Sequence, residues 1–562
     1  MNKTSSILGI NSFSHDTSAC LLIDGQVVAY VEQERFDRLV HTKAFPDNAI
    51  EFCLKTAGLD IGQVDLICFS HDPKIDFLRG SKDAILRGSP KRLLAQSVID
   101  YNLAAKEKSF RSRWNYKGKI LNVGHHEAHA ASAFFASNFE SAAVLTLDRG
   151  GDFLSSTLGM GQGNRLNIFS HVKNPHSLGE IYSAITWFLG FHPNSDEGKV
   201  MGLSSYGHRS SSTDLSRLIK LLSDGLFEVD LSWFRYQRQG RRPVSNKFLK
   251  KYGPPRKSSD DIAIYHQNMA FAVQELTERA GIHIARSLQQ KTGSKRLCLS
   301  GGVALNSVMN AKILSETKFE EIFIQPAASD AGNALGAALW AWHEHLGNER
   351  SWNMQHAFFG PQYGEKEAAN AFSKSGIKFQ KLNDAPTCAA QLLSEGNVVG
   401  WFNGRAEMGP RALGNRSILA DPRRAEMKDI VNQRIKHREG FRPFAPSVLD
   451  EKGHQYFENY STNPFMLLVL PVLEEKRSII PAVTHVDGTG RLQSVTKDFN
   501  SNFYRLIQQF EAITGVPVVL NTSFNLAGEP MVSTPEQAIA DFLKSEMDAL
   551  FLGNLLATKK DL

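Results

Sequence analysis

The sequence has few cysteines, and none of them are arranged as a site. Its five cysteines are scattered along the chain and include no CxxC pair, so neither a disulfide framework nor a thiolate zinc site is expected. The chain also lacks any apolar run of about 18 residues, the length that a transmembrane helix needs. Its first residues show no apolar core and no cleavage site of a signal peptide. These absences predict a cytoplasmic protein in a reducing compartment, without a membrane partner.

The charge balance of the chain is only mildly basic. The formal net charge is +6 over 562 residues, which is too weak to imply a nucleic-acid partner but could attract anionic substrates. Hydrophobic residues make up 42% of the chain and charged residues 22%, as in ordinary globular proteins. A chain of this length exceeds one hydrophobic core, and roughly three or four compact units are expected.

Two stretches of the chain share the same order of predicted elements. In residues 6–36, apolar β-formers flank Asp24 and Gly25, which is a strong hairpin signal. Residues 141–172 repeat the pattern of strand, Gly-rich turn and strand, with an acidic residue at the end of the first strand. Two subdomains of related topology, each opening with a hairpin, resemble the plan of the actin-like ATPase (ASKHA) fold. We therefore predict an α/β fold of that type for the first part of the chain.

A domain junction is predicted at residues 347–368, which are polar and lack periodicity. We place a first domain at residues 1–351 and a second domain of mixed α/β character at residues 352–562. Within the first domain the pattern weakens from Tyr206 to Lys257, and the part from Arg235 onward contains many Arg and Lys but no Asp or Glu. That part is either a solvated loop or a lid over an anionic ligand.

The sharpest local motif is GHHEAH, which contains His125 and His129. Residues four apart project from one face of a helix, and this spacing suits two nitrogen ligands of one divalent metal. The motif alone is short, and a pair of structural histidines is the simpler interpretation of it. However, two apolar strands lead to Asp148 and Asp330, and carboxylates at strand ends lie at the mouth of the cleft in α/β folds. We therefore predict an N/O metal site formed by these four residues, suited to Fe(II), Mn(II) or Zn(II).

Several glycine-containing segments are candidates for phosphate binding. Gly301, Gly302 and Asn306 lie between a predicted strand and helix, where backbone N–H groups can approach phosphate oxygens. Gly332 opens the next helix in the same way, and Lys199 in the polar SDEGKVMGL segment could reach a phosphate. For each stretch taken alone, a tight turn or an exposed loop is the alternative.

A cluster of cations marks the second domain. Arg presents a rigid fork that matches phosphate and carboxylate oxygens, so converging arginines could bind a small dianion and a nucleotide phosphate. The candidate anion-binding residues of this domain are Arg411, Arg416, Lys436, His437, Arg438, Arg442 and Arg491, with Asn521, Ser523 and Asn525 as neutral partners. The alternative is that each is a surface residue paired with a local acid or amide.

Taken together, these stretches resemble the NodU/CmcH/TobZ family of carbamoyltransferases. The matching strings keep their order over nearly the whole chain and include EQERFDRLVHTKAFP, HHEAHAASAFF, DEGKVMGLSSYG, SGGVALNSVMN, GRAEMGPRALGNRSILADP and LNTSFNLAGEP. The first domain of that family is similar to the actin-fold enzymes that place threonylcarbamoyl on tRNA, and its second domain is YrdC-like. The resemblance therefore implies an actin-like domain followed by a YrdC-like α/β domain.

The resemblance also implies a mechanism with two sites. The second domain would take carbamoyl phosphate and ATP and form carbamoyl-adenylate, with Lys436 and Arg442 as catalytic residues and Arg411, Arg491 and Ser523 as further binders. The carbamoyl group would then pass to a hydroxyl of a small-molecule acceptor in the first domain. Fe(II) is the expected metal of the first domain, and a magnesium ion with the nucleotide is left open.

Two residues of the first domain complete what the resemblance implies. His15, in the SHDTSA string, matches a family histidine near the acceptor and would act either as general base or as an orienting group only. Arg149 stands where the family usually has Gly, which reaches positive φ at little cost. The turn there could differ, or Arg149 could contact an anionic group.

The oligomeric state stays open, and the resemblance suggests a homodimer. Three classes of acceptor or role also stay open. The first is a hydroxyl of an antibiotic, toxin or glycolipid. The second is a tRNA adenosine or a protein cysteine, although the net charge of +6 gives tRNA little support and the scattered cysteines exclude zinc fingers. The third is a nucleotide-dependent regulator without enzymatic activity, which would not explain a cationic second domain.

Overall fold

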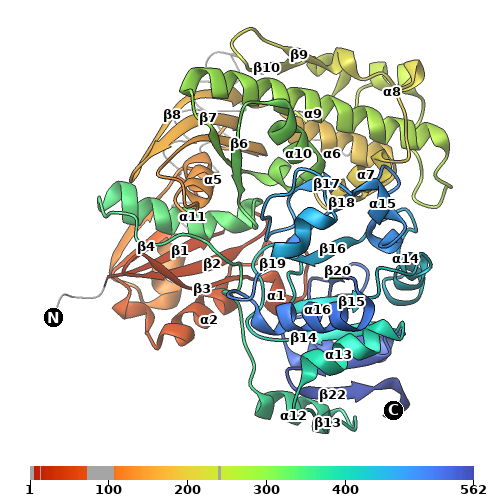
Figure 1. Ribbon diagram of the computed structural model, residues 1–562. Helices are drawn as coiled ribbons and strands as arrows, with labels where there is room; N and C mark the ends of the chain where they lie inside the picture. Colours follow the sequence, from red (N-terminus) through yellow and green to blue (C-terminus); the bar gives the residue numbers. More distant parts are fainter. Residues whose placement is uncertain (1–4, 13, 73–106, 238–241, 562) are drawn as a thin grey trace. The chain divides into compact units, whose positions relative to one another are not determined.

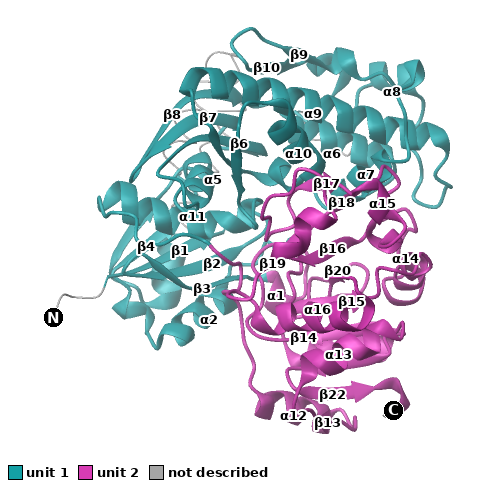
Figure 2. Cartoon of the chain, in the orientation of Figure 1, with its two compact units in different colours: residues 1–33, 41–354 teal, residues 34–40, 355–562 magenta. Residues whose placement is uncertain are grey.

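The structure is a computed structural model that describes residues 5–12, 14–72, 107–237 and 242–561 (Figure 1). The chain forms two compact units (Figure 2). The first contains Met1–Gln33 and His41–Met354, and the second contains Glu34–Val40 and Gln355–Leu562. The sequence analysis places Glu34–Val40 in the first domain, but the packing of this short segment groups it with the second unit.

The first sheet of the first unit has five strands in the order β3-β2-β1-β4-β5. Its strands are β1 (Ser6–Asn11), β2 (Ser18–Ile23), β3 (Gln26–Glu32), β4 (Leu66–Phe69) and β5 (Lys119–Asn122). Strands β1, β2 and β3 are antiparallel, whereas β4 and β5 run parallel to β1. Asp24 and Gly25 form the predicted hairpin turn, with φ of 49° and 78°.

The second sheet repeats this topology with the order β12-β11-β6-β7-β8. Its strands are β6 (Ser141–Gly151), β7 (Leu154–Gln162), β8 (Arg165–Lys173), β11 (Arg296–Ser300) and β12 (Glu321–Ile324). Again the first three strands form antiparallel hairpins, and β11 and β12 run parallel to the first. Because both sheets place their hairpin strands and their parallel strands in the same order, the predicted actin-like plan of two related subdomains is confirmed.

The helices of the first unit are α2 (Asp47–Ala57), α5 (His125–Phe134), α6 (Leu178–Phe188), α7 (Glu197–Ser204), α8 (Asn246–Tyr252), α9 (Ile264–Thr292), α10 (Ser307–Glu316) and α11 (Asn333–Trp340) (Figure 1). Helices α2, α5, α6, α9 and α11 pack against its sheets, and α7 and α10 pack against α9. Helix α11 packs against both β1 and α5, and glycine makes the close approach possible. A Cβ on Gly9 would lie 1.9 Å from the Ala334 carbonyl oxygen, and a Cβ on Gly336 would lie 1.9 Å from that of Ala128.

The weakly patterned stretch from Tyr206 to Lys257 is largely ordered in the structure. It contains the short strands β9 (Ile219–Leu221) and β10 (Phe227–Val229) and the helix α8. Its aromatic side chains Trp233 and Phe248 are buried, which explains why a segment rich in Arg and Lys folds instead of staying solvated. Residues 238–241 lie outside the described part of the chain.

The second unit is built on an eight-stranded mixed sheet in the order β13-β22-β21-β14-β15-β20-β16-β19. Its strands are β13 (Gln380–Lys381), β14 (Val399–Phe402), β15 (Arg416–Ala420), β16 (Ala445–Leu449), β19 (Gln493–Val495), β20 (Val518–Ser523), β21 (Ala549–Leu552) and β22 (Leu555–Thr558). The strands β17 (Val469–Pro471) and β18 (Thr489–Arg491) form a separate pair. The helices are α1 (Glu34–Asp37), α12 (Glu365–Lys374), α13 (Ala385–Ser394), α14 (Met427–Ile430), α15 (Glu474–Arg477), α16 (Ser501–Thr514) and α17 (Pro535–Lys544). Among the helices that the structure describes, none has the length and apolarity needed to cross a membrane.

Replacing Gly336 by Ala tests the close packing of α11 on α5. The added Cβ has backbone as its nearest neighbour, so we expect the midpoint of thermal unfolding to fall, with a cost of about 1–3 kcal/mol from overpacking. Gly198, in the helix α7, is the matched control because a Cβ there meets nothing within 4 Å. Gly198→Ala should raise stability by up to about 1 kcal/mol through helix propensity. Equal midpoints for the two variants would contradict the packing described here.

Candidate functional site

Helix α5 brings two imidazole rings to one point of the first unit. It begins directly after β5, and the Asp152 carboxylate accepts a hydrogen bond of 2.5 Å from the backbone N–H of His125. His125 and His129 are one turn apart and both are buried, with ring centroids 4.7 Å apart. The intervening His126 points elsewhere and bonds with Thr146 at 2.8 Å. Burial lowers the pKa of His126 to about 3, so this imidazole is neutral.

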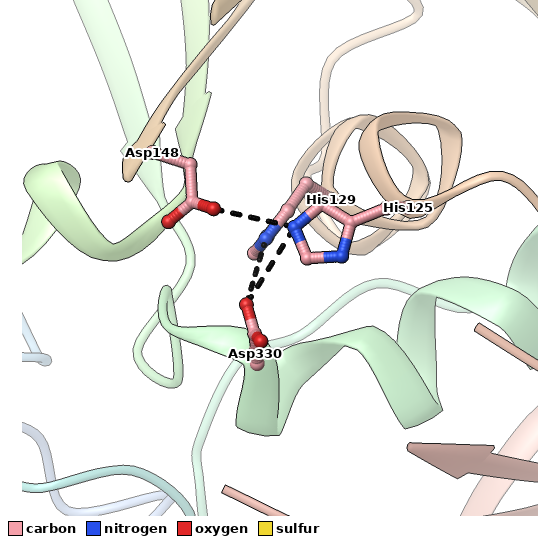
Figure 3. Close-up of side chains that lie close together, drawn as sticks. All are labelled: His125, His129, Asp148 and Asp330. Atoms are coloured by element: carbon pink, nitrogen blue, oxygen red, sulfur yellow. Dashed lines mark hydrogen bonds and ion pairs between the residues drawn. The ribbon is translucent and has the colours of Figure 1, made fainter. Parts of the chain in front are cut away.

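Two buried carboxylates face the imidazoles (Figure 3). Asp148 lies in β6, and its Oδ2 is 3.2 Å from His125 Nε2. Asp330 lies past the end of β12, and its Oδ1 is 3.6 Å from His125 Nε2 and 3.5 Å from His129 Nε2. The sequence analysis named these four residues together, and the structure brings one ligand atom of each within 4.8 Å of all the others.

The residues of this cluster all follow the carboxyl ends of parallel strands or lie close to such an end. His125 follows β5 in the first sheet, whereas Asp148 lies near the end of β6 and Asp330 follows β12 in the second. His129 joins the second sheet through Ser300, the last residue of β11, whose hydroxyl is 3.3 Å from His129 Nδ1. The carboxyl edge of a parallel sheet is the usual place of a binding site in open α/β folds.

Opposite charges hold the cluster together. Burial alone would lower the pKa of His125, but the carboxylates of Asp330 and Asp148 outweigh it and raise that pKa to about 10. Burial alone would raise the pKa of Asp148, but the hydrogen bond from His125 and the neighbouring imidazoles lower it well below its ordinary value. An imidazolium proton thus offsets part of the negative charge of two buried carboxylates, a role that a divalent cation would also serve.

The donor set fits a divalent transition metal. Two imidazole nitrogens and two carboxylate oxygens, with no sulfur, suit Fe(II), Mn(II) or Zn(II). Ligands that lie about 2.0–2.2 Å from one metal are separated from each other by roughly 3–4 Å, and the contacts of 3.2–3.6 Å between these side chains agree with that spacing. The Ser300 hydroxyl at His129 Nδ1 leaves Nε2 directed at the shared point, as is usual for a metal-binding histidine.

His15 lies at the edge of the cluster. Its Nε2 is 3.9 Å from Asp330 Oδ2, and its Nδ1 is 3.2 Å from Asp16 Oδ2. Burial would lower the pKa of His15, but the hydrogen bond with Asp16 and the charge of Asp330 raise it above the ordinary value. The side chain of His15 keeps 29% exposure, so a ligand can reach it.

The sequence analysis missed three residues around His15. The Ser14 hydroxyl donates to Asp330 Oδ2 at 3.1 Å. Asp16 bonds to His41 as well as to His15, with His41 Nδ1 2.5 Å from Asp16 Oδ1. Ser14 and Asp16 flank His15 in the SHDTSA string, so the sequence alone places them beside it. The contact of His41 with Asp16 depends on the folded chain.

The predicted phosphate-binding glycines contribute to the packing around the cluster of His125, His129, Asp148 and Asp330. The N–H of Gly302 donates to Asp148 Oδ1 at 3.0 Å. Gly301 has φ of 96°, and a Cβ there would lie 2.2 Å from the Leu147 carbonyl oxygen. A Cβ on Gly332 would similarly lie 2.3 Å from the Ala327 carbonyl oxygen. These glycines let the turns that carry Asp148 and Asp330 pack closely.

Two other predicted phosphate ligands have local partners. The Asn306 carbonyl Oδ1 accepts from the N–H of Met309 at 3.0 Å and caps α10. Lys199 Nζ pairs with Asp196 Oδ1 at 3.1 Å within the same segment. Binding of a phosphate at either residue stays a prediction.

The structure shows how the turn accommodates Arg149 at a position where the family usually has Gly. It is absent from the positive-φ residues of the described chain, and Gly150, Asp152 and Phe153 take positive φ in its place, at 155°, 51° and 62°. Its guanidinium donates to Asn194 Oδ1 at 2.9 Å. The turn therefore accommodates Arg149 by placing the special backbone conformation on later residues.

Four arginines gather in the second unit. Burial and the charge of Arg442 lower the pKa of Arg411 to about 10 and that of Arg438 to about 9. Burial, together with the charges of Arg411, Arg438 and Arg442, holds the pKa of Arg491 well below its ordinary value. In the part of the chain that the structure describes, Arg411, Arg438 and Arg491 have no carboxylate partner in an ion pair, and Arg442 Nη1 lies 3.9 Å from Glu439. Such an excess of positive charge is suited to a polyanion.

Lys436 is fully surrounded by hydrogen-bond acceptors. Its Nζ is 2.7 Å from the Ser523 carbonyl oxygen and 2.8 Å from that of Asn525, and it also contacts Asn525 Oδ1. The Ser523 hydroxyl donates to Asn525 Oδ1 at 2.7 Å. Burial lowers the pKa of Lys436 well below its ordinary value. The hydrogen bonds join Lys436 and the loop after β20 into one polar unit.

Arg416 and Asn521, two predicted anion binders, have structural partners instead. Arg416 is buried, donates to the carbonyl oxygens of Asn403 at 2.6 Å and Pro361 at 2.9 Å, and lies over the Phe402 ring at 3.6 Å. The Asn521 amide donates to Ser447 Oγ at 3.0 Å and is also buried. The Asn521 contact joins β20 to β16, and the Arg416 contacts join β15 to the segments that contain Asn403 and Pro361. Anion binding by either residue stays a prediction.

Fold and site together define an α/β enzyme with an actin-like first unit. The N-terminal model of the carbamoyltransferases matches residues 6–339, and their C-terminal model matches residues 390–559. Nodulation protein NolNO of Sinorhizobium fredii is 38% identical over 565 residues, which cover 98% of this chain and 80% of that protein. Nodulation protein NolO of Bradyrhizobium diazoefficiens is 40% identical over 446 residues, 78% of this chain and 79% of that protein. The chain therefore belongs to the carbamoyltransferase family and is a carbamoyltransferase.

Solved structures are similar only in a general way. Full-length HypF in its phosphate- and nucleotide-bound form covers 62% of this chain with 56% of its own length, at 12% identity and a TM-score of 0.34. A likeness at that level says nothing about activity or substrate.

The four-residue cluster predicts bound metal that depends on both histidines. We expect the purified protein to carry close to one divalent ion per chain, and a His125→Ala/His129→Ala double variant to carry almost none, because half of the ligand set is lost. Elemental analysis by mass spectrometry measures both. His208→Ala, at an exposed histidine of the same unit, is the control and should keep its metal. Unchanged metal in the double variant would show that the ion binds elsewhere.

Proposed function

We propose that the protein is an ATP-dependent O-carbamoyltransferase that makes carbamoyl-adenylate in its second unit and uses it in its first. Water releases phosphate from carbamoyl phosphate and leaves carbamate, whose oxygen then attacks the α-phosphorus of ATP and displaces pyrophosphate. The products of this half-reaction are carbamoyl-adenylate, pyrophosphate and phosphate. The acceptor hydroxyl then attacks the carbamoyl carbon and AMP leaves.

The observation that carries this proposal is the gathering of Arg411, Arg438, Arg442 and Arg491 without balancing carboxylates on three of them. Both donor substrates are polyanions, and charge accumulates on phosphoryl oxygens as the α-phosphorus changes partner. Fixed guanidinium groups stabilise such charge without having to reorganise. A YrdC-like identity of the second unit, as the sequence resemblance implies, belongs to the same proposal.

Lys436 is the natural point of contact for the small dianion. It is held by acceptors of the Ser523–Asn525 segment, and an incoming phosphate would compete for its protons. Because its ammonium group is buried, the interaction with an anion there would be stronger than in water. Arg416 and Asn521 would act by shaping the sheet beneath this loop.

In the first unit, His15 would take the proton of the acceptor hydroxyl at Nε2 while Asp16 orients the ring through Nδ1. His125, His129, Asp148 and Asp330 would hold Fe(II) or another divalent metal, and Gly302 and Ser300 would keep two of these ligands in place. When bound, such a metal supplies Lewis acidity toward a carbonyl or hydroxyl oxygen. AMP is a good leaving group, so little further activation is needed.

The acceptor is proposed to be a hydroxyl of a small molecule of natural-product or sugar type. The ordered stretch from Tyr206 to Lys257 would shape its pocket, because loops of this kind carry specificity on a shared fold. A homodimer in the cytoplasm is the proposed state of the protein.

The first half-reaction can be tested without knowing the acceptor. The wild-type protein, given carbamoyl phosphate, ATP and Mg²⁺, should form carbamoyl-AMP and pyrophosphate, both detected by mass spectrometry. Arg442→Ala should slow this by about 10²–10³-fold, because one charge contact to the reacting phosphates is lost. Arg434→Ala is the matched control: that arginine lies in the same unit, and its side chain is 63% exposed. Pyrophosphate release that does not require carbamoyl phosphate would refute the proposal.

His15→Asn should separate the two half-reactions. The amide cannot accept the hydroxyl proton at neutral pH, so the transfer step should slow by about 10²–10⁴-fold while adenylate formation continues. With a sugar-type acceptor present, we therefore expect carbamoyl-AMP to persist in this variant and to be consumed in the wild type, as measured by quenched-flow sampling and mass spectrometry. Loss of both half-reactions to the same degree would mean that His15 does not act in transfer alone.

A further inference from the structure

The segment Glu34–Val40 comes from the N-terminal part of the chain but belongs to the second unit. The chain leaves the first unit after Gln33 and is back in it at His41. The segment contains the single-turn helix α1 and then Arg38, whose φ is 61°. A left-handed conformation is uncommon for a residue with a side chain, and it persists only where surrounding contacts hold it.

Arg35 ties this segment to the loop that carries Arg411. Its side chain is only 4% exposed, and its Nη2 donates to the Gly409 carbonyl oxygen at 2.7 Å. Gly409 lies two residues before Arg411. The same loop is braced from within, because Glu407 Oε1 accepts from the N–H of Leu413 at 2.8 Å. A buried bond from a charged donor to a carbonyl is among the stronger hydrogen bonds in proteins.

Arg38 ties the segment to the loop that surrounds Lys436. Its Nη1 donates to the Met531 carbonyl oxygen at 2.7 Å, and its Nη2 donates to Glu529 Oε2 at 2.9 Å. The carbonyl oxygen of Glu529 in turn accepts from Asn525 Nδ2 at 2.6 Å. The other end of that amide, Oδ1, contacts the Lys436 ammonium. Arg38 is thus linked to Lys436 through two residues, and both lie in one loop.

These two arginines differ in kind from those of the cationic cluster. Arg35 donates to a backbone carbonyl oxygen of one loop and Arg38 to one of the other, and each also lies near a carboxylate, that of Glu34 or Glu529. From positions 374 and 493 residues away in sequence, they contact the two loops on which Arg411, Ser523 and Asn525 are carried. The second unit is therefore incomplete without Glu34–Val40, a segment that comes before most of the first unit in the sequence.

We propose that Arg35 and Arg38 are positioning residues of the carbamoyl phosphate site, each fixing one of the two loops that form it. The inference rests on the proposed function for the identity of the ligand. Small displacements of binding groups have large effects on reaction, since a misplacement of about 1 Å can cost about 10²-fold in rate. Arg38 is the better residue to test, because its side chain is 23% exposed whereas that of Arg35 is only 4% exposed.

The test measures the affinity of the full-length protein for carbamoyl phosphate in two ways. One is the KM for carbamoyl phosphate in carbamoyl-AMP formation at saturating ATP, and the other is the Kd from calorimetry without ATP. For Arg38→Ala we expect both constants to rise by between about 10- and 100-fold, with the KM for ATP and the thermal midpoint close to those of the wild type. Arg38→Lys keeps the positive charge but loses the two-pronged guanidinium group that donates to both Met531 and Glu529. It should therefore recover only part of the affinity for carbamoyl phosphate.

Arg505→Ala is the matched control, because Arg505 forms an exposed ion pair with Asp384 in the same unit. It should leave both constants unchanged. If Arg38→Ala does not fold, Glu529→Gln decides, since it weakens the same contact from the other side and should raise the Kd in the same direction. Wild-type constants in both Arg38→Ala and Glu529→Gln would overturn the inference. A wild type that binds carbamoyl phosphate but forms no carbamoyl-AMP would count against the proposed function and leave the calorimetric test of Arg38 valid.

Discussion

The first unit depends on the attraction between two buried carboxylates, Asp148 and Asp330, and two buried imidazoles, His125 and His129. Neither pair could be buried alone, because an uncompensated charge in the interior costs several kcal/mol. The fold meets this constraint by bringing the carboxyl edges of two sheets of the same topology to one place, so that strand ends supply the acids and the helix after β5 supplies the bases. The close-packed glycines serve the same end, since Gly301 and Gly302 let the turn after β11 reach Asp148.

The second unit has an excess of buried positive charge. Burial first, and then the charges of neighbouring arginines, lower the pKa values of Arg411, Arg438 and Arg491. A polyanion at this cluster would offset both the burial of these charges and their repulsion. The loops that carry these groups are fixed by bonds to backbone carbonyls, including those from Glu34–Val40. One unit thus gathers buried carboxylates and imidazoles and the other gathers buried arginines, and the proposed mechanism with two sites rests on these two clusters.

Much of the first unit could be predicted from sequence, because its signals are local. The hairpin at Asp24–Gly25, the spacing of His125 and His129, and the strand ends at Asp148 and Asp330 each follow from a few neighbouring residues. Long-range contacts could not be predicted. The sequence does not reveal that Arg416 donates to a carbonyl oxygen of a distant loop, or that Glu34–Val40 groups with the second unit. The charged stretch before Lys257 folds because Trp233 and Phe248 find partners that no local pattern reveals.

The central claim is that the carbamoyl group passes through an adenylate, and heavy-oxygen labelling tests it most directly. Carbamoyl phosphate labelled on the oxygens bound to its carbamoyl carbon is incubated with the wild-type protein, ATP and a sugar-type acceptor, and the mass of the AMP formed is measured by mass spectrometry. The carbamate oxygen that attacks the α-phosphorus stays with AMP when the acceptor cleaves the bond between that oxygen and the carbamoyl carbon, so the account predicts a heavy oxygen in AMP. AMP without label would contradict it, because its new oxygen would then come from water, and consumption of carbamoyl phosphate without any AMP would favour direct transfer from carbamoyl phosphate.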